Sequence, residues 1–191
     1  MKFFGRRKQD SPIDDDVEPA DDTPITRLEK ALADTRRNFG AEHPETLRVA
    51  EELAEAHEQN DDPGRAIPYL AEVLEVRRDE LGALDPKVLA IGARLAYDTG
   101  RALTQADNPN RAIRSYELAL TLHNQVYGPE HPQTLSVAVD LANSYDAVGD
   151  FIQLIPLLAE IHGTLSQLYG DDHKLTQALL TRLDEARSRP R

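Results

Sequence analysis

The sequence contains no cysteine and no tryptophan, and aromatic residues make up only 5% of its 191 residues. Without cysteine the chain has no disulfide bond, no thiol nucleophile and no cysteine-based metal site. Because aromatic side chains are scarce, the core must consist mainly of leucine, alanine, isoleucine and valine. No apolar stretch approaches membrane-spanning length, and no apolar segment follows the basic N-terminus as it would in a secretory signal. These absences predict a cytoplasmic protein.

Basic residues are also fewer than acidic residues. The chain has 22 lysines and arginines against 34 aspartates and glutamates, for a net charge of −12. Since a nucleic-acid-binding surface needs a basic face, we expect no nucleic-acid partner. No Ser/His/Asp set, glycine-rich phosphate loop or HExxH motif is present, and the carboxylates are spread along surfaces rather than paired across a pocket. We therefore expect a non-catalytic protein without cofactor or metal.

What the sequence does contain is a repeated octet, clearest as GPEHPQTL from Gly128. Its four copies begin at Gly40, Gly82, Gly128 and Gly170, so they lie 42, 46 and 42 residues apart. A near-constant period in this range is typical of stacked helical repeats. The glycine suits the left-handed conformation that closes a helix, the histidine or aspartate three residues later is a candidate N-cap, and proline follows in three copies. Each octet therefore predicts that one helix ends and another begins.

The octet also places histidines at one repeated position, in three of its four copies. They are His43, His131 and His173. One interpretation is a histidine metal or acid–base site, and the other is a turn residue multiplied along with its repeat. Because a stacked array would hold the three copies apart, we favour the turn.

Apolar residues at helical spacing predict a half pair of helices from Thr23, three full pairs and a C-terminal capping helix. Pro68 is expected in the first turn of its helix, since a mid-helix proline costs about 3 kcal/mol. The second full pair has four extra residues, about one helical turn. Either the helix around Leu95 or the loop around Asn108 is longer, and the Asn-Pro-Asn sequence favours the loop. The apolar helix of about residues 152–168 is predicted to be the most buried.

This pattern divides the chain into three parts. Residues 1–22 are expected to be a disordered tail with a basic start and an acidic remainder, because they have too few apolar residues to fold. Residues 23–187 form the helical repeat domain, and residues 188–191 form a basic C-terminal end.

Two segments carry a family resemblance. They are Ala112-Ile-Arg-Ser-Tyr116-Glu-Leu-Ala119-Leu and Leu141-Ala-Asn-Ser-Tyr145, the latter followed by Gly149-Asp-Phe. With the repeats aligned, the chain over about residues 24–187 resembles tetratricopeptide repeats, of the roughly 42-residue type found in kinesin light chains. The resemblance implies an all-α, right-handed superhelical solenoid of antiparallel helix pairs. A three-helix, armadillo-like array is the alternative, which two helices per period disfavour.

The resemblance further implies that the first helix of each pair lines a concave groove that binds peptides or partner proteins. Carried over position by position, the groove residues are Arg48, Glu51, Glu55, Glu58, Arg94, Tyr97, Arg101, Asp140, Asn143 and Asp146. Kinesin light chains have paired asparagines before the Leu-Ala dipeptide, where this chain has Glu51-Glu52, Ala93-Arg94 and Val139-Asp140. The cargo specificity of that family is therefore not transferred. We expect a protein- or peptide-binding scaffold.

Two alternatives remain open. In one, the N-terminal tail docks on a partner or an anionic membrane surface through Phe3, Phe4, Arg6, Arg7 and Lys8, although a single short segment rarely anchors stably. In the other, the unpaired first helix and the apolar last pair drive homo-oligomerisation, because an uncovered apolar side favours association.

Overall fold

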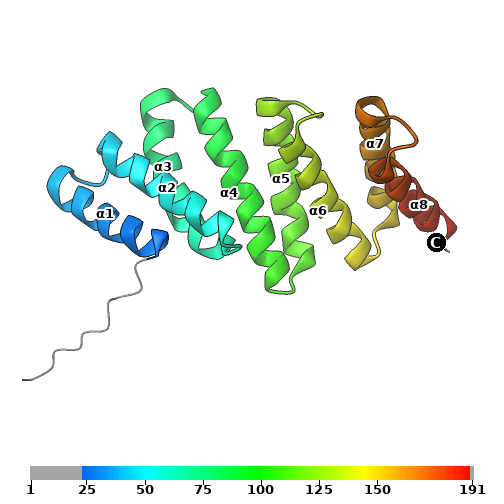
Figure 1. Ribbon diagram of the computed structural model, residues 1–191, viewed down its shortest axis with the longest axis horizontal. Coiled ribbons are helices and arrows are strands. Elements are labelled where there is room, and N and C mark those ends of the chain that lie inside the picture. The colour runs from blue at the N-terminus through cyan, green and yellow to red at the C-terminus, as the bar shows by residue number, and fades with distance from the viewer. Residues whose placement is uncertain (1–22, 190–191) are drawn as a thin grey trace, which may run out of the picture.

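The computed structural model describes residues 23–189, which form eight α-helices stacked side by side in chain order (Figure 1). The predicted all-α array of antiparallel helix pairs is confirmed, whereas the predicted tail of residues 1–22 lies outside the described residues. The helices are α1 (Pro24–Phe39), α2 (Pro44–Gln59), α3 (Pro63–Leu81), α4 (Pro86–Gln105), α5 (Pro109–Tyr127), α6 (Pro132–Val148), α7 (Phe151–Tyr169) and α8 (Lys174–Ser188).

The octet glycines end four helices with positive φ but not with the left-handed helical conformation that the sequence predicts. Gly40, Gly82, Gly128 and Gly170 have φ between 85° and 94° and ψ between 155° and 167°. This backbone region is open essentially to glycine alone. Its extended ψ sends the chain out of the helix toward the next N-cap instead of curling it back. Only Gly149, after α6, has the left-handed helical values of φ 72° and ψ 21°.

The repeated histidines are N-caps, so the turn interpretation is confirmed. In each, Nδ1 accepts a hydrogen bond from the backbone N–H two residues later, over 3.2 Å in His43 and His131 and 3.3 Å in His173. Each ring also stacks on the aromatic residue that ends the preceding helix, at centroid distances of 4.7–4.9 Å. The second copy has neither ring, and there the Asp85 carboxylate caps α4.

The four extra residues lengthen α4 and not the loop that follows it, so the preferred loop prediction is wrong. Helix α4 has 20 residues against 16 in α2. The three-residue turn after each is the same, with positive φ at Asp61 and at Asp107. The added turn of α4 has its own packing partner, because Thr104 Oγ lies 3.2 Å from the hydroxyl of Tyr116 on α5.

Two further expectations about the helices are also wrong. Pro68 is the sixth residue of α3, because Pro63 already occupies the first turn behind the N-cap Asp62. Helix α7 has four buried residues, whereas α2 and α6 have seven each. First helices lie between helices on both sides, but α7 leaves one side open, where Ile152 is 83% exposed.

Candidate functional site

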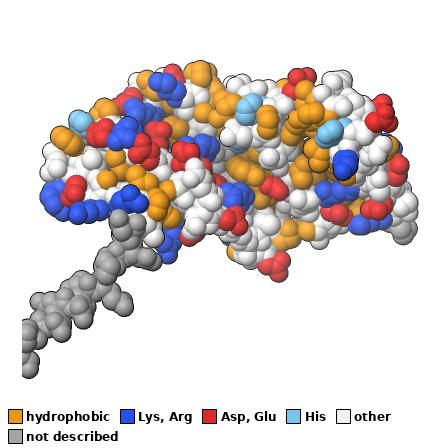
Figure 2. Space-filling view, in the orientation of Figure 1, with side chains coloured by type: hydrophobic (Ala, Val, Ile, Leu, Met, Phe, Trp, Pro, Cys, Tyr) orange, Lys and Arg blue, Asp and Glu red, His pale blue; other side chains and the backbone are white. Residues whose placement is uncertain are grey.

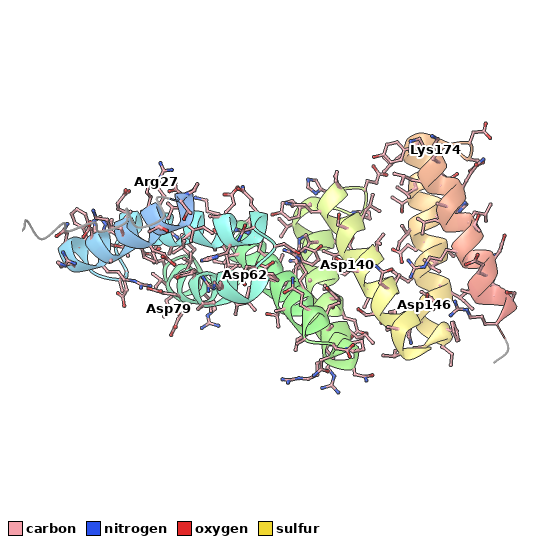
Figure 3. All side chains as sticks on the ribbon, turned by 60° about the horizontal axis from the view of Figure 1, so that its bottom comes forward. Arg27, Asp62, Asp79, Asp140, Asp146 and Lys174 are labelled. Carbon is pink, nitrogen blue, oxygen red and sulfur yellow. The ribbon has the colours of Figure 1, made fainter. Side chains whose placement is uncertain are left out.

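Polar contacts connect the first helices of successive pairs. Arg94 on α4 donates to Glu58 on α2 over 2.9 Å, and the Tyr97 hydroxyl donates to Asp140 on α6 over 2.8 Å. Asp146, farther along α6, accepts from Arg189, just beyond α8, over 2.8 Å. Figure 3 shows Asp140 and Asp146 along the length of α6. The structure therefore pairs predicted groove residues with each other across the repeats in two cases, whereas Asp146 pairs with Arg189, which the sequence did not predict.

Two other predicted groove residues on α2, Arg48 and Glu55, instead make contacts within their own helix. Arg48 pairs with Glu45 over 2.6 Å and also with Glu52, while Glu55 accepts from Gln59 over 3.2 Å. Exposed pairs of this kind contribute about 0–1 kcal/mol each. Figure 2 shows charged side chains of both signs gathered over the N-terminal helices. Glu51 is half-buried, Glu55 is exposed, and neither lines the two pockets that Tyr97 lines.

An apolar cleft of about 640 Å³ lies among α4, α6, α7 and α8. Tyr97, Asp140 and Arg182 stand among the polar residues at its edge. Sequence reasoning placed Val139 at a groove position but missed the other apolar residues, although i, i+4 spacing on two first helices was a usable signal. Apolar residues make up most of the lining, among them Leu135, Val139, Ile161, Leu165, Leu175 and Leu179.

A second, polar pocket of about 200 Å³ adjoins this cleft, and Tyr97 and Ser136 line both. We refer to it as the Asp98 pocket. Among the other residues that line it are Glu58, Arg94, Asp98, Arg101 and His123. The sequence predicted the glutamate and both arginines, but not Asp98 or His123.

Burial defines the chemistry of two groups in this pocket. Burial, followed by the hydrogen bond to Asp140, raises the pKa of Tyr97, so its hydroxyl stays a neutral donor. Burial lowers the pKa of His123. The His123 Nδ1 lies 2.8 Å from the carbonyl oxygen of Ala119, and because a carbonyl only accepts, Nδ1 carries the hydrogen. The pocket therefore presents a neutral imidazole whose Nε2 is an acceptor.

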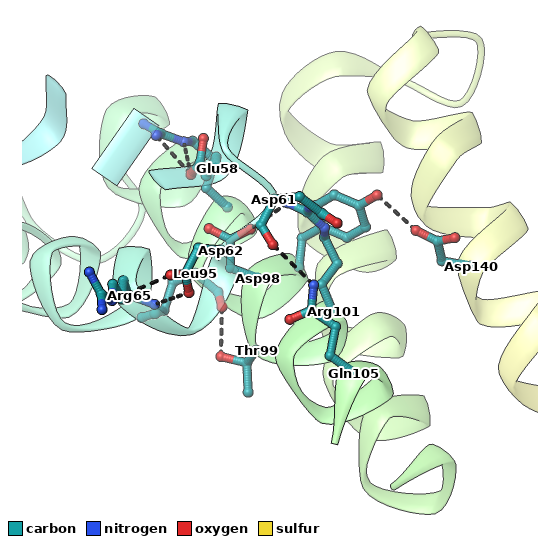
Figure 4. Close-up of polar contacts among 12 residues, drawn as sticks. Glu58, Asp61, Asp62, Arg65, Leu95, Asp98, Thr99, Arg101, Gln105 and Asp140 are labelled. Atoms are coloured by element: carbon teal, nitrogen blue, oxygen red, sulfur yellow. Dashed lines mark hydrogen bonds and ion pairs between the residues drawn. The ribbon is translucent and has the colours of Figure 1, made fainter. Parts of the chain in front are cut away.

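Asp98 is the most unusual side chain of the groove. It is only 2% exposed, and it lies close to Glu58, Asp61 and Arg101 (Figure 4). Its Oδ1 accepts from Arg101 over a long 3.4 Å, while its Oδ2 has no hydrogen-bond partner. Burial, followed by the charge of Glu58, raises the pKa of Asp98 to about 7 against the opposing effect of Arg101.

We predict that the free energy of unfolding falls less with rising pH in Asp98→Asn than in wild type. The folded protein holds the Asp98 proton more tightly than the unfolded chain, whose carboxyl has a pKa of about 3.9. Its contribution to stability is therefore complete below about pH 4 and is lost as pH rises through about 7. At pH 8 the asparagine variant should be more stable than wild type by about 1–2 kcal/mol.

Urea unfolding at pH 5, 6, 7 and 8 followed by circular dichroism measures this effect. The matched control is Asp79→Asn, an exposed position on α3 (Figure 3). Equal pH slopes for wild type and Asp98→Asn would show that Asp98 is ionised throughout this range.

The described residues contain neither of two features that would indicate a different kind of site. Within residues 23–189, no group of three or more His, Asp or Glu side chains is placed to hold a metal ion. No helix in that range is long and apolar enough to cross a membrane.

Comparisons with known proteins agree with this geometry. The family model for the tetratricopeptide repeat matches residues 25–79 and 93–153. The unmatched stretch between these segments contains the weak second octet. A comparison with curated protein sequences finds no match.

Among solved structures, the chain is similar to the nearly identical TPR-like repeats of a kinesin light chain from Podosopora anserina. The TM-score is 0.62 at 25% identity, over 85% of this chain and 77% of that one. A single-residue variant of those repeats gives the same score and identity over 85% and 76%. BtubC (BKLC) from P. vanneervenii, at 21% identity and a TM-score of 0.55 over 86% and 66% of the two chains, shares the fold.

Proposed function

The chain belongs to the tetratricopeptide repeat family, and from this premise we propose that it binds a peptide segment of a partner protein in the groove along α4, α6 and α8. Its fold is the right-handed superhelical solenoid that the sequence predicts. Such arrays serve as protein-interaction scaffolds, and the proposed role here is non-catalytic.

The observation that carries this proposal is the apolar cleft. Its lining is mostly apolar, and Leu175 is 56% exposed there. An apolar concavity with a few polar groups at its edge is the usual form of a binding site. A partner side chain entering it would gain about 25 cal/mol per Å² of apolar surface removed from water. The neighbouring hydroxyl of Tyr97 and guanidinium of Arg182 supply directional contacts.

The prediction from this proposal is that Ser136→Trp abolishes peptide binding. Ser136 is exposed and lines both pockets, so an indole at this position fills the entrance. Peptides selected from a phage-displayed random library on the full chain should lose at least about tenfold in affinity for this variant. Fluorescence anisotropy with labelled peptides measures the change.

The matched control is Thr121→Trp, an exposed position on α5 outside both pockets. The two hydroxyls are comparable, since each donates to the backbone carbonyl four residues earlier in its own helix. Peptides that bind both variants equally well would place binding outside the groove and contradict the proposal.

Self-association is a second candidate, because Ile152 is 83% exposed at the start of α7 beside Phe151. A dimer through this face would appear as a concentration-dependent mass in sedimentation equilibrium, and Ile152→Glu would remove it. The expectations of a cytoplasmic location and of a docking role for the tail residues Phe3 and Phe4 stay predictions.

A further inference from the structure

One acceptor in the groove is left without a donor. Asp98 lines the polar pocket, its side chain is 98% buried, and its Oδ2 has no hydrogen-bond partner. Leaving such an atom unpaired costs more than a typical hydrogen bond contributes. Because Asp98 lines the pocket, a ligand donor that reaches this oxygen would restore the missing bond.

The two cations of the same pocket are already engaged. Arg94 gives both its Nε and its Nη2 hydrogen to Glu58, over 3.2 and 2.9 Å. Arg101 donates to Asp61 and, more weakly, to Asp98. Both guanidinium groups of the pocket are therefore already paired with carboxylates, whereas one oxygen of the Asp98 carboxyl group has no donor.

We propose that the Asp98 pocket binds the ammonium or guanidinium group of a lysine or arginine side chain in the partner peptide. This inference rests on the proposed function, because the same peptide places an apolar side chain in the adjoining cleft. The two compartments share Tyr97 and Ser136, so the basic and apolar residues lie close together in the peptide sequence.

Size and charge favour this ligand. The pocket volume of about 200 Å³ accommodates the end of one side chain. Glu58 on α2 also lines the pocket, and two more carboxylates contact its lining residues, since Asp61 pairs with Arg101 and Asp140 accepts from Tyr97. Hydrogen bonds that join a carboxylate to a cation are roughly twice as strong as neutral ones.

An acidic side chain fits the pocket poorly. To reach Arg94 or Arg101 it would have to displace Glu58 or Asp61, which already pair with these guanidinium groups. It would then lie beside the buried carboxyl of Asp98. Repulsion of this kind works against the wrong partner as much as attraction favours the right one.

Binding of a cation is coupled to release of a proton. Before binding, Asp98 has a pKa raised by burial and by the charge of Glu58. A bound ammonium group favours the ionised carboxylate and displaces that proton. The affinity for a basic side chain should therefore rise between pH 6 and pH 8. Against the opposing effect of burial, the hydrogen bond to Asp61 raises the pKa of Arg101, which stays a cation, and burial lowers the pKa of His123 on α5, which stays neutral.

The test uses the full chain and peptides selected on it from a phage-displayed random library. Selected peptides should share a lysine or arginine at a constant distance from a large apolar residue. In one such peptide, changing that residue to glutamine or glutamate should lower affinity for wild type at least about tenfold at pH 8. This comparison changes only the peptide, so it does not depend on how a protein variant folds.

The protein-side comparison uses Asp98→Asn with Asp79→Asn as the control. The Asp98 variant should bind the lysine and glutamine peptides about equally at both pH 6 and pH 8, whereas the control should keep the wild-type preference. Some peptides should bind wild type but not Ser136→Trp. The inference is overturned if replacing the basic residue of such a peptide with glutamine leaves its affinity for wild type unchanged, or if replacing it with glutamate raises that affinity. If every selected peptide binds Ser136→Trp as tightly as it binds wild type, the proposed function is wrong and this inference is wrong with it.

Discussion

Tyr116→Ala is expected to lower the free energy of unfolding by about 3–5 kcal/mol. Tyr116 on α5 is only 2% exposed, and it is the largest fully buried side chain among the described residues. Its ring packs at a centroid distance of 5.9 Å from Tyr97 on α4. Because one face of this ring also covers Gly100, removing it would leave a cavity that two rigid helices cannot close.

Urea unfolding followed by circular dichroism measures this loss, and Tyr116→Phe is the control. Phenylalanine keeps the ring but loses the contact of the hydroxyl with Thr104, which should cost about 0.5–1.5 kcal/mol. If alanine costs no more than phenylalanine, the α4–α5 packing described above is wrong.

Gly100→Ala is expected to destabilise the protein by about 1–3 kcal/mol, although replacing glycine with alanine inside a helix usually stabilises a protein. A Cβ atom at Gly100 would lie 2.5 Å from Cε1 and 2.6 Å from Cδ1 of Tyr116. Those distances are far inside van der Waals contact, and the buried ring has no free space to move into. The clash should therefore outweigh the gain of about 0.5–1 kcal/mol that alanine normally brings.

The control is Gly163→Ala in α7, where an added Cβ would meet nothing within 4 Å. That variant should be more stable than wild type by about 0.5–1 kcal/mol. Repeating Gly100→Ala in the Tyr116→Ala background should abolish its cost, because the ring it collides with is gone. A stabilising Gly100→Ala in the wild-type background would contradict the packing of α4 on α5.

The polar half of the candidate site could be predicted from the sequence, and the rest could not. Glu58, Arg94 and Asp140 were named because the aligned repeats place them on the groove-facing side of the first helices. The alignment did not show that the first two bond to each other, since pairing between α2 and α4 depends on the angle at which the repeats stack. For the same reason the apolar cleft was missed, because it exists only where α6, α7 and α8 separate.

Asp98 shows this limit most clearly. In the sequence it follows Tyr97 on a helix with both polar and apolar positions, and nothing in its neighbours marks it as buried. Only the approach of α2 brings Glu58 beside it, removes it from water and raises its pKa.

The sequence by itself determined the number of helices and the residues at which each octet ends one helix and begins the next. Those features depend on local rules, since glycine at positive φ, an N-cap side chain and a first-turn proline act within a few residues. The tertiary structure alone decided that the four extra residues lengthen α4. It also decided that Gly100 has no room for a methyl group and that the carboxyl group of Asp98 is buried with one oxygen lacking a hydrogen-bond donor. Each of these depends on distances between helices that no local pattern contains.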